Sequence, residues 1–285
     1  LTHTPEELRG ILSGEYRTDF EGKPVYKPPF NTSLHVGSFP VVKATVVRGW
    51  DFGYHHPVVT WHQMIRCEFH RPHWRILREM ILEDLDYKDL YASVVEHGET
   101  WFPDHNRYMY LDAGDAAGAQ VSDKGPGPII ELAKPPYNIR FHYNAMRDID
   151  PSVRFIRDLL RSKCDCGHYL LEVDRECPEV IEMFSGGYHF PKDRGGVVKP
   201  LAKPVKDGYY DNIADSVRYC GWNLYRPASV DPGFLTELGK WQGPPDDSLI
   251  VSPREFGWMG DWVPNDVSAE TWEEAFRESK MTGRR

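Results

Sequence analysis

Acidic residues stand at the ends of several predicted elements. Asp51 closes the predicted strand in KATVVRGWDFG, and Asp112 and Asp115 follow the one in RYMYLDAGD. Asp211 and Asp215 are four residues apart at the start of a predicted helix, so their side chains share one face. Acids at the ends of neighbouring strands, joined by acids from a helix that crosses those strands, can converge on one point.

Converging carboxylates repel one another unless a cation neutralises them. Oxygen ligands suit Mg²⁺ or Mn²⁺, and two such ions about 3.5–4 Å apart can activate water and stabilise the leaving oxygen of a phosphodiester. Each acid also has a structural interpretation, because Asp between Gly residues is common in turns and Asp at a helix start is common as a cap. The joint pattern, rather than any single acid, therefore predicts a site for two divalent ions.

Histidine and basic residues lie close to these acids in the sequence. We interpret His55 and His56 as turn residues, and a role toward a metal or DNA is the alternative. The segment KDRGGVVKPLAKPVK leads into the last acidic pair, and we interpret it as a flexible basic finger for backbone phosphates, with a solvated loop as the alternative. Its basic residues are Lys192, Arg194, Lys199, Lys203 and Lys206. Lys206 is the best candidate for a residue near a scissile phosphate.

The segment CDCGHYLLEVDREC holds four further residues that can bind metals. They are Cys164, Cys166, His168 and Cys177. A zinc site is conceivable, but Cys-x-Cys is not the usual two-residue spacing. We therefore interpret these cysteines as buried or surface thiols.

Hydrophobic patterns define the elements that must position the acids. Three β-branched or apolar runs with short spacings predict an antiparallel meander at 43–53, 58–69 and 74–82. A helix with Asp86 as N-cap follows at 86–102. Strands at 107–115, 138–144 and 168–174 then alternate with helices at 126–136, 150–163, 177–187 and 209–225. This order predicts an α/β fold with a mixed central sheet, in which three antiparallel strands are followed by parallel strands and helices flank the sheet.

Composition divides the chain into three parts. Residues 1–40 are irregular and Pro-rich, which predicts a linker or an arm lying on the domain. Residues 41–226 carry the strand and helix patterns of one domain. Residues 227–285 are rich in Pro, Gly, Trp and acids, so we expect a tail without its own core, packed on the domain or partly flexible, with a last helix at 268–280 capped by Ser268.

The bulk composition excludes several classes of protein. The chain has 285 residues, of which 40% are hydrophobic, so a packed core is expected. It lacks a run of some 18 uncharged apolar residues, which predicts that nothing spans a membrane. Five cysteines are too few for a disulfide framework and indicate a reducing, intracellular setting. A net charge of −9 argues mildly against nucleic acid as a partner, although local basic groups can still bind phosphates.

Three motifs, in order, resemble the nuclease motifs of bacteriophage large terminase subunits. RGWDFGYHHPVVTWHQ resembles the first, in which a strand ends in Gly-x-Asp-x-Gly and a Gln follows in the next strand. LDAGDAAGAQVSDKG resembles the second, and YYDNIADSVRY resembles the third, a helix start of the form Asp-x-x-x-Asp-Ala-x-x-Tyr. The resemblance runs from about residue 20 to 226.

The resemblance implies an RNase H-like fold and a metal-dependent DNA endonuclease with two Mg²⁺ or Mn²⁺ ions. It implies Asp51 as the central ligand and Asp115 as the second acid, with Asp112 a poorer match. Asp211 and Asp215 match the third motif. Many members have a second adjacent Asp where this chain has Asn212, which leaves open whether Asp211 or Asp215 is the main third ligand.

The resemblance also implies a setting. Members of this family cut concatemeric viral DNA during genome packaging, in the host bacterial cytoplasm and transiently on the procapsid portal. The chain has no Gly-x-x-x-x-Gly-Lys-Ser/Thr loop, so we interpret it as a C-terminal nuclease domain. Implied partners are double-stranded DNA, an upstream ATPase domain of the same polypeptide, the portal and the small terminase subunit. The alternatives are a junction resolvase or transposase type of RNase H-like nuclease, and a non-catalytic DNA-gripping or portal-docking module.

Overall fold

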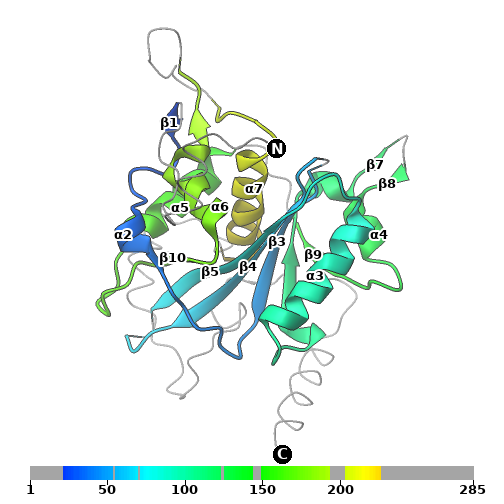
Figure 1. Ribbon diagram of the computed structural model, residues 1–285, viewed down its shortest axis with the longest axis horizontal. Coiled ribbons are helices and arrows are strands. Elements are labelled where there is room, and N and C mark those ends of the chain that lie inside the picture. The colour runs from blue at the N-terminus through cyan, green and yellow to red at the C-terminus, as the bar shows by residue number, and fades with distance from the viewer. Residues whose placement is uncertain are drawn as a thin grey trace, which may run out of the picture.

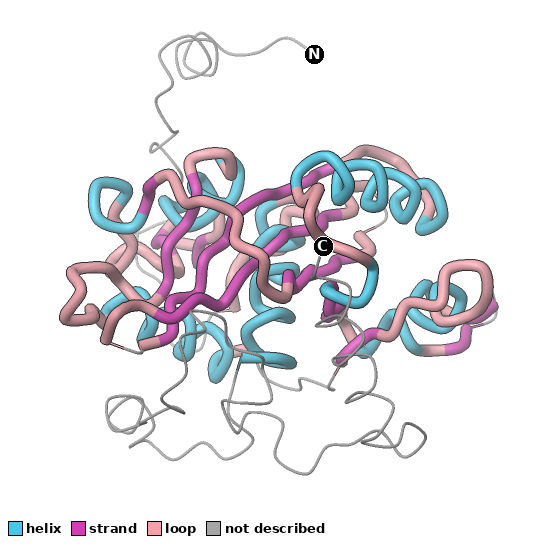
Figure 2. Tube along the Cα trace, turned by 90° about the horizontal axis from the view of Figure 1, so that it is seen from below, coloured by secondary structure: helices cyan, strands magenta, loops and turns pink. Residues whose placement is uncertain are grey.

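A seven-stranded mixed sheet is the central element of the computed structural model, which describes residues 22–53, 55–69, 71–122, 125–143, 149–192 and 203–225. Figure 2 shows its strands running side by side with a pronounced twist. In spatial order the strands are β2 (Val36–Gly37), β10 (Leu171–Asp174), β5 (Pro72–Ile81), β4 (Val58–Arg66), β3 (Val46–Asp51), β6 (Tyr110–Ala113) and β9 (Phe141–His142).

The strand directions match the prediction. β3, β4 and β5 form an antiparallel meander, while β6 and β9 continue the sheet in parallel beyond β3. At the other edge, β10 and β2 run parallel to β5. Every residue of the central strand β4 is buried, because helices cover both faces of the sheet. The predicted mixed sheet with flanking helices is thus confirmed.

Helices pack on both faces of the sheet (Figure 1). α3 (Tyr87–Trp101) and α4 (Pro128–Leu132) cover one face, where Trp50, Trp61 and Leu77 form a core. α5 (Asp150–Arg161), α6 (Pro178–Glu182) and α7 (Tyr210–Cys220) cover the other. As predicted, Asp86 caps α3, and its Oδ1 accepts the backbone N–H groups of Lys88 and Asp89 at 2.8 and 3.0 Å.

Short elements complete the described part. 3₁₀ turns precede and follow β6 at Arg107–Met109 and Ala116–Ala119, and a two-stranded ribbon joins β7 (Val121–Ser122) to β8 (Gly125–Pro126). π-helical turns extend α6 and α7 at Met183–Gly187 and Gly221–Tyr225. No helix within these described ranges has the length and apolar character needed to cross a bilayer.

Residues 22–40, assigned to an arm by the sequence analysis, take part in the fold. β1 (Lys23–Pro24) pairs with β11 (His189–Phe190), and α2 (Thr32–His35) leads into β2. Val25, Tyr26 and Phe30 are buried in the core on the face that α5, α6 and α7 cover. Residues 1–21, residue 226, the tail at 227–285 with its expected helix, and the basic residues Arg194 and Lys199 lie outside the described residues.

Candidate metal centre

β3 delivers the first acid to the face of the sheet that α7 covers. A Cβ built at Gly49 would lie 2.1 Å from the carbonyl oxygen of Ser216 in α7, so the strand and helix backbones are in close contact there. Asp51 is two residues further along β3 and therefore points to the same face. Its Oδ1 accepts the backbone N–H of Gly53 at 2.9 Å, so the aspartate also shapes the turn that ends the strand.

A buried chain of hydrogen bonds fixes α7 on the sheet. Trp74 Nε1 donates to His62 Nδ1 at 2.9 Å, so the other imidazole nitrogen carries the proton and donates to Thr60 Oγ1 at 2.7 Å. Thr60 in turn contacts Ser216 Oγ at 2.6 Å, and Ser216 donates to the Gly49 carbonyl at 2.8 Å. Burial lowers the pKa of His62 to about 3. The imidazole is therefore neutral, and its unprotonated Nδ1 can accept the hydrogen bond from Trp74.

α7 delivers two more acids, one turn apart. Asp211 lies in the first turn and is buried, and its Oδ1 accepts the Gly208 backbone N–H at 2.6 Å. Burial, followed by a hydrogen bond and repulsion from Asp207, raises the pKa of Asp211 to about 6. Asp215, four residues further on, shares the same face of the helix.

The four aspartates predicted from the sequence come into one electrostatic neighbourhood. Burial raises the pKa of Asp51 well above its ordinary value. The negative charge of Asp215 is the next largest cause, and those of Asp211 and Asp115 add to it. Asp115 comes from the turn after β6, where it precedes a 3₁₀ turn without capping it through its side chain. Its carboxylate is thus not used as a cap.

The sequence analysis assigned no role to two neighbours of Asp215. The guanidinium of Arg218 is buried, forms an ion pair with Asp215 Oδ1 and donates to Ser152 Oγ at 3.0 Å. The hydroxyl of Tyr219 donates to Asp215 Oδ2 at 3.4 Å. Burial, and then the charges of Asp215, Asp51 and Asp115, raise the pKa of Tyr219. The available signal was spacing, because Arg218 and Tyr219 lie three and four residues after Asp215.

Asp112 belongs to the opposite face of the sheet. Arg48 Nε and Nη2 donate to its two carboxylate oxygens at 2.7 and 2.8 Å, and Trp50 Nε1 donates at 2.6 Å. Arg48 and Trp50 alternate with Asp51 along β3, so they point away from α7. Asp112 is a buried structural carboxylate, consistent with its poorer match to the family motif.

His55 and His56 lie in the turn between β3 and β4. His55 is exposed and its Nδ1 lies 2.9 Å from Asp84 Oδ1. The ring of His56 packs edge-on against Tyr209 with centroids 5.2 Å apart, and its carbonyl accepts a hydrogen bond from Asn212 Nδ2 at 2.9 Å. Asn212 thus ties the β3–β4 turn to the start of α7.

Three of the five predicted basic residues are described. Lys192 follows β11, and Lys203 and Lys206 lie on the segment that leads into α7; all three are exposed. The backbone N–H of Val205 donates to the His189 carbonyl at 2.9 Å, which anchors this segment to β11. Lys206 stands immediately before Asp207, whose side chain accepts from the start of α7.

Comparison with known proteins identifies the fold. No family model matches the sequence, and no curated protein matches it. The structure resembles the large terminase of the thermophilic bacteriophage D6E, with a TM-score of 0.54 and 15% identity over 72% of this chain and 46% of that one. This chain thus spans about half the length of that terminase. The RNase H-like fold predicted from the motifs is confirmed at this level.

Two isolated nuclease domains give weaker structural matches. The P22 large terminase nuclease domain matches with a TM-score of 0.48 and 18% identity over 71% of this chain and 92% of that one. The nuclease domain of the bacteriophage SPP1 large terminase, solved with bound Mn, matches with a TM-score of 0.44 and 14% identity over 66% and 95%.

Proposed function

We propose that this chain is a metal-dependent DNA endonuclease, the nuclease part of a large terminase subunit. The observation that carries the proposal is that Asp51, at the end of β3, lies in the electrostatic field of Asp115, from the turn after β6, and of Asp211 and Asp215, from α7. The pKa of Asp51 is raised by burial and by all three of the other acids. A fold that gathers negative charge in this way loses stability unless a cation compensates for it.

The chemistry of these side chains fits Mg²⁺ or Mn²⁺, because every donor is a carboxylate oxygen. Asp51 lies in the electrostatic field of the other three acids, so it would hold the ions together with Asp115 and the α7 acids. When bound, the ions would activate the attacking water and stabilise the oxygen that leaves phosphorus. Arg218 and Tyr219 each hold one oxygen of Asp215 and so fix how that carboxylate is presented.

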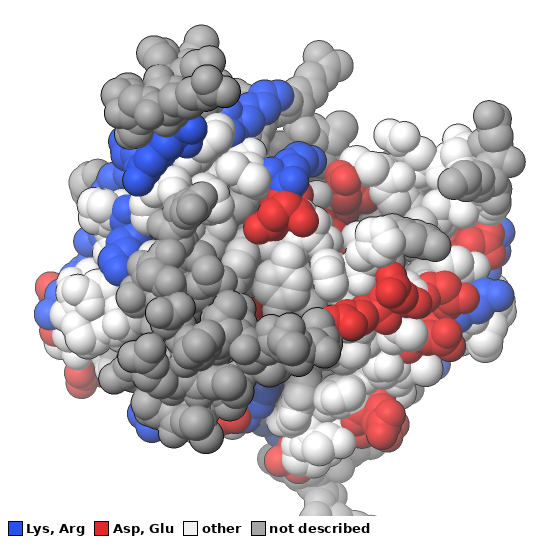
Figure 3. Space-filling view, turned by 45° about the horizontal axis from the view of Figure 1, so that its top comes forward, with Lys and Arg blue, Asp and Glu red and all other residues white. Residues whose placement is uncertain are grey.

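The substrate backbone would approach along the segment that leads into α7. Lys203 and Lys206 are exposed there, a few residues before Asp211, and Lys192 follows β11. Figure 3 shows a face on which Asp and Glu side chains extend from the centre to the right, while Lys and Arg gather at the upper left. Exposed lysines a few residues before Asp211 suit a DNA strand held by its phosphates beside an acidic metal site.

The proposed reaction is hydrolysis of a DNA phosphodiester. Water attacks phosphorus, the bond from phosphorus to the 3′ oxygen breaks, and the products are a 5′-phosphate and a 3′-hydroxyl. By the resemblance of its motifs, we assign the cutting to concatemeric viral DNA during packaging, in the host bacterial cytoplasm. An upstream ATPase domain, the portal and the small terminase subunit would then direct the cutting.

Nicking of supercoiled plasmid tests the proposal. We expect nicking with Mn²⁺ or Mg²⁺, none with EDTA, and a loss of about 100-fold or more in Asp51→Asn, because a lost ligand should cost at least as much as a lost outer-shell partner. Asp104→Asn, which alters an exposed aspartate outside the cluster, should nick like the wild type. Equal activity in the wild type and Asp51→Asn would reject the proposed site. A preference for four-way junctions over linear duplex would favour a resolvase instead.

A further inference from the structure

Three cysteines and one histidine meet at the edge of the molecule where β4 turns into β5. Cys67 directly follows β4, His73 is the second residue of β5, and the Cys67 backbone N–H closes this turn on the Arg71 carbonyl at 3.1 Å. Cys164 and Cys166 come from the loop between α5 and β10, about a hundred residues later in the sequence.

The loop between α5 and β10, which carries Cys164 and Cys166, forms a tight turn. The Cys164 backbone N–H donates to the His168 carbonyl at 2.8 Å, and the Gly167 N–H donates back to the Cys164 carbonyl at 2.9 Å. Gly167 has a φ of +93°, a conformation that favours glycine. This backbone presents both thiols toward the β4–β5 turn.

The distances match those of a tetrahedral zinc site. The Sγ atoms of Cys67 and Cys164 are 3.5 Å apart, and Cys166 Sγ lies 3.4 Å from His73 Nε2. The four ligand atoms all lie within 4.8 Å of one another. Zn–S bonds of about 2.3 Å and Zn–N bonds of about 2.1 Å place neighbouring ligands of a tetrahedron roughly 3.6 to 3.8 Å apart, close to the spacings found here.

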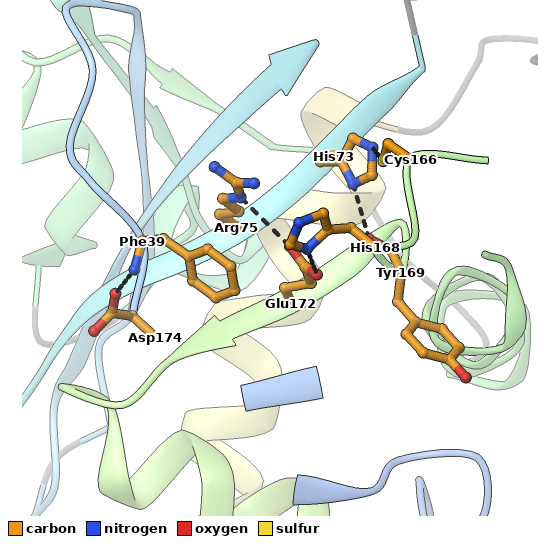
Figure 4. Close-up of polar contacts among 8 residues, drawn as sticks. All are labelled: Phe39, His73, Arg75, Cys166, His168, Tyr169, Glu172 and Asp174. Carbon is orange, nitrogen blue, oxygen red and sulfur yellow. Dashed lines mark hydrogen bonds and ion pairs between the residues drawn. The ribbon is translucent and has the colours of Figure 1, made fainter. Parts of the chain in front are cut away.

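The histidine is oriented as a ligand. His73 Nδ1 donates to the Tyr169 carbonyl at 2.9 Å, which leaves the Nε2 lone pair facing Cys166 (Figure 4). Metal-binding histidines almost always make such a bond with their other nitrogen. His73 is only 2% exposed, so burial and the carbonyl together fix its ring before any metal binds.

Among the described residues, His168 and Cys177 do not belong to the group whose ligand atoms lie within 4.8 Å of one another. His168 Nδ1 contacts Glu172 Oε1 at 2.6 Å, and Arg75 contacts the other oxygen of Glu172 at 3.4 Å (Figure 4). Cys177 lies in the core, with its Sγ 3.9 Å from the Ile76 carbonyl. Of the zinc ligands considered from the sequence, Cys164 and Cys166 remain, while Cys67 and His73 replace the other two.

We propose that Cys67, His73, Cys164 and Cys166 bind one structural zinc ion. The ion clamps the β4–β5 turn to the loop that precedes β10, and so holds the parallel edge of the sheet to the antiparallel meander. Four protein ligands leave no open position, which is typical of structural rather than catalytic zinc. The sulfur and nitrogen donors also separate this site from the all-oxygen aspartate cluster, so the inference does not depend on the proposed nuclease activity.

Metal analysis of the purified chain tests the proposal. We expect about one zinc per chain by mass spectrometry after exchange into buffer with a mild chelator. Replacement by Co²⁺ should give thiolate-to-metal absorption in the near ultraviolet, which carboxylate ligands do not produce. Asp51→Asn should retain the zinc and the cobalt spectrum, whereas the double variant Cys164→Ser, Cys166→Ser should lose both. Cys177→Ala is the matched control and should retain both.

The wild type alone can overturn the inference, even if the double variant fails to fold. A chain that holds under about a tenth of an equivalent of zinc and gives no thiolate band with Co²⁺ has no such site. A Cys67–Cys164 disulfide, found by counting thiols in the denatured chain without reductant, would replace the zinc with a covalent link. Zinc retained in full by the double variant would place the ion elsewhere.

Discussion

Burial and neighbouring negative charges raise the pKa values of aspartates in the candidate metal site. Asp211 has a pKa of about 6 because it is buried beside Asp207 and Asp215. Asp51, at the end of β3, has its pKa raised by burial and by three neighbouring acids. Groups with pKa values shifted in this way by burial and by like charges are frequent at functional sites. The same shifts make the metal-free protein sensitive to pH.

Without metal, the free energy of unfolding should fall as pH rises from about 4 to 7. An unfolded aspartate has a pKa of about 3.9, and the folded Asp211 has one of about 6, so between these values the folded chain binds more protons. The stabilisation is complete below the unfolded pKa and is lost as pH passes the folded one. Urea unfolding in EDTA should show this slope, and Asp211→Asn should flatten it. Saturating Mn²⁺ should also flatten it, and an unchanged slope with Mn²⁺ would argue against metal binding at Asp211.

Arg218 should matter for stability as much as for activity. It is the buried partner of Asp215, with a side chain 4% exposed. Arg218→Met leaves that carboxylate without its counter-charge, and breaking a buried pair by removing one partner costs about 3–5 kcal/mol. The double variant Arg218→Met, Asp215→Asn should recover part of this loss, because no charge is then left unpaired. Denaturant unfolding of the single and double variants measures both effects, and additive losses would contradict the pairing.

At the scale of elements, the contact between β3 and α7 positions the acids. The glycines flanking Asp51 serve this contact, since a Cβ at Gly49 would lie 2.1 Å from the Ser216 carbonyl and a Cβ at Gly53 would lie 2.1 Å from Asn212 Nδ2. In the structure they let a helix approach the strand, which is what brings the α7 acids toward Asp51.

Gly49→Ala should therefore destabilise the protein and impair metal binding together. The new methyl group would push α7 from β3, and overpacking of this kind costs about 1–3 kcal/mol. Gly98→Ala is the matched control. It lies inside α3 with its nearest contact at 3.5 Å, so alanine should be neutral or stabilising by up to about 1 kcal/mol. Thermal unfolding with and without Mn²⁺ reports both effects, and equal melting temperatures for the two variants would contradict the β3–α7 argument.

Elements whose apolar residues repeat with the spacing of a strand or a helix were predictable from the sequence. Short strands that depend on pairing with a strand far away in the sequence were not. β3 ends at Asp51 and α5 covers Asp150–Arg161, as their apolar spacing indicated. β1, β2 and β11 have two residues each, too few for any periodicity. They exist because residues 22–40 pair with strands more than a hundred residues away. The local sequence pattern does not indicate which distant strand a segment will pair with.

At the scale of the whole molecule, the two candidate metal sites differ in how far the sequence reveals them. Asp51, Asp115, Asp211 and Asp215 occupy strand ends and a helix start, positions from which the sequence predicts a common site, and in the structure the charges of the other three acids act on Asp51. The cysteine–histidine cluster instead combines a β-turn with a loop about a hundred residues later. Cys-x-Cys alone supplies half of a ligand set, and only the tertiary fold supplies Cys67 and His73.

DNA binding should depend on a few local cations, because the whole chain carries a net charge of −9. Lys203 and Lys206 are exposed just before α7, so Lys203→Ala with Lys206→Ala should weaken binding to all duplex sequences. The logarithmic salt slope should fall by up to about 2, since each phosphate contact contributes roughly 0.9. Lys88→Ala with Lys134→Ala removes two exposed lysines, one from α3 and one from the second position after α4, and should leave the slope unchanged. Fluorescence anisotropy at several salt concentrations measures the slopes, and equal slopes for the two pairs would place the DNA path elsewhere.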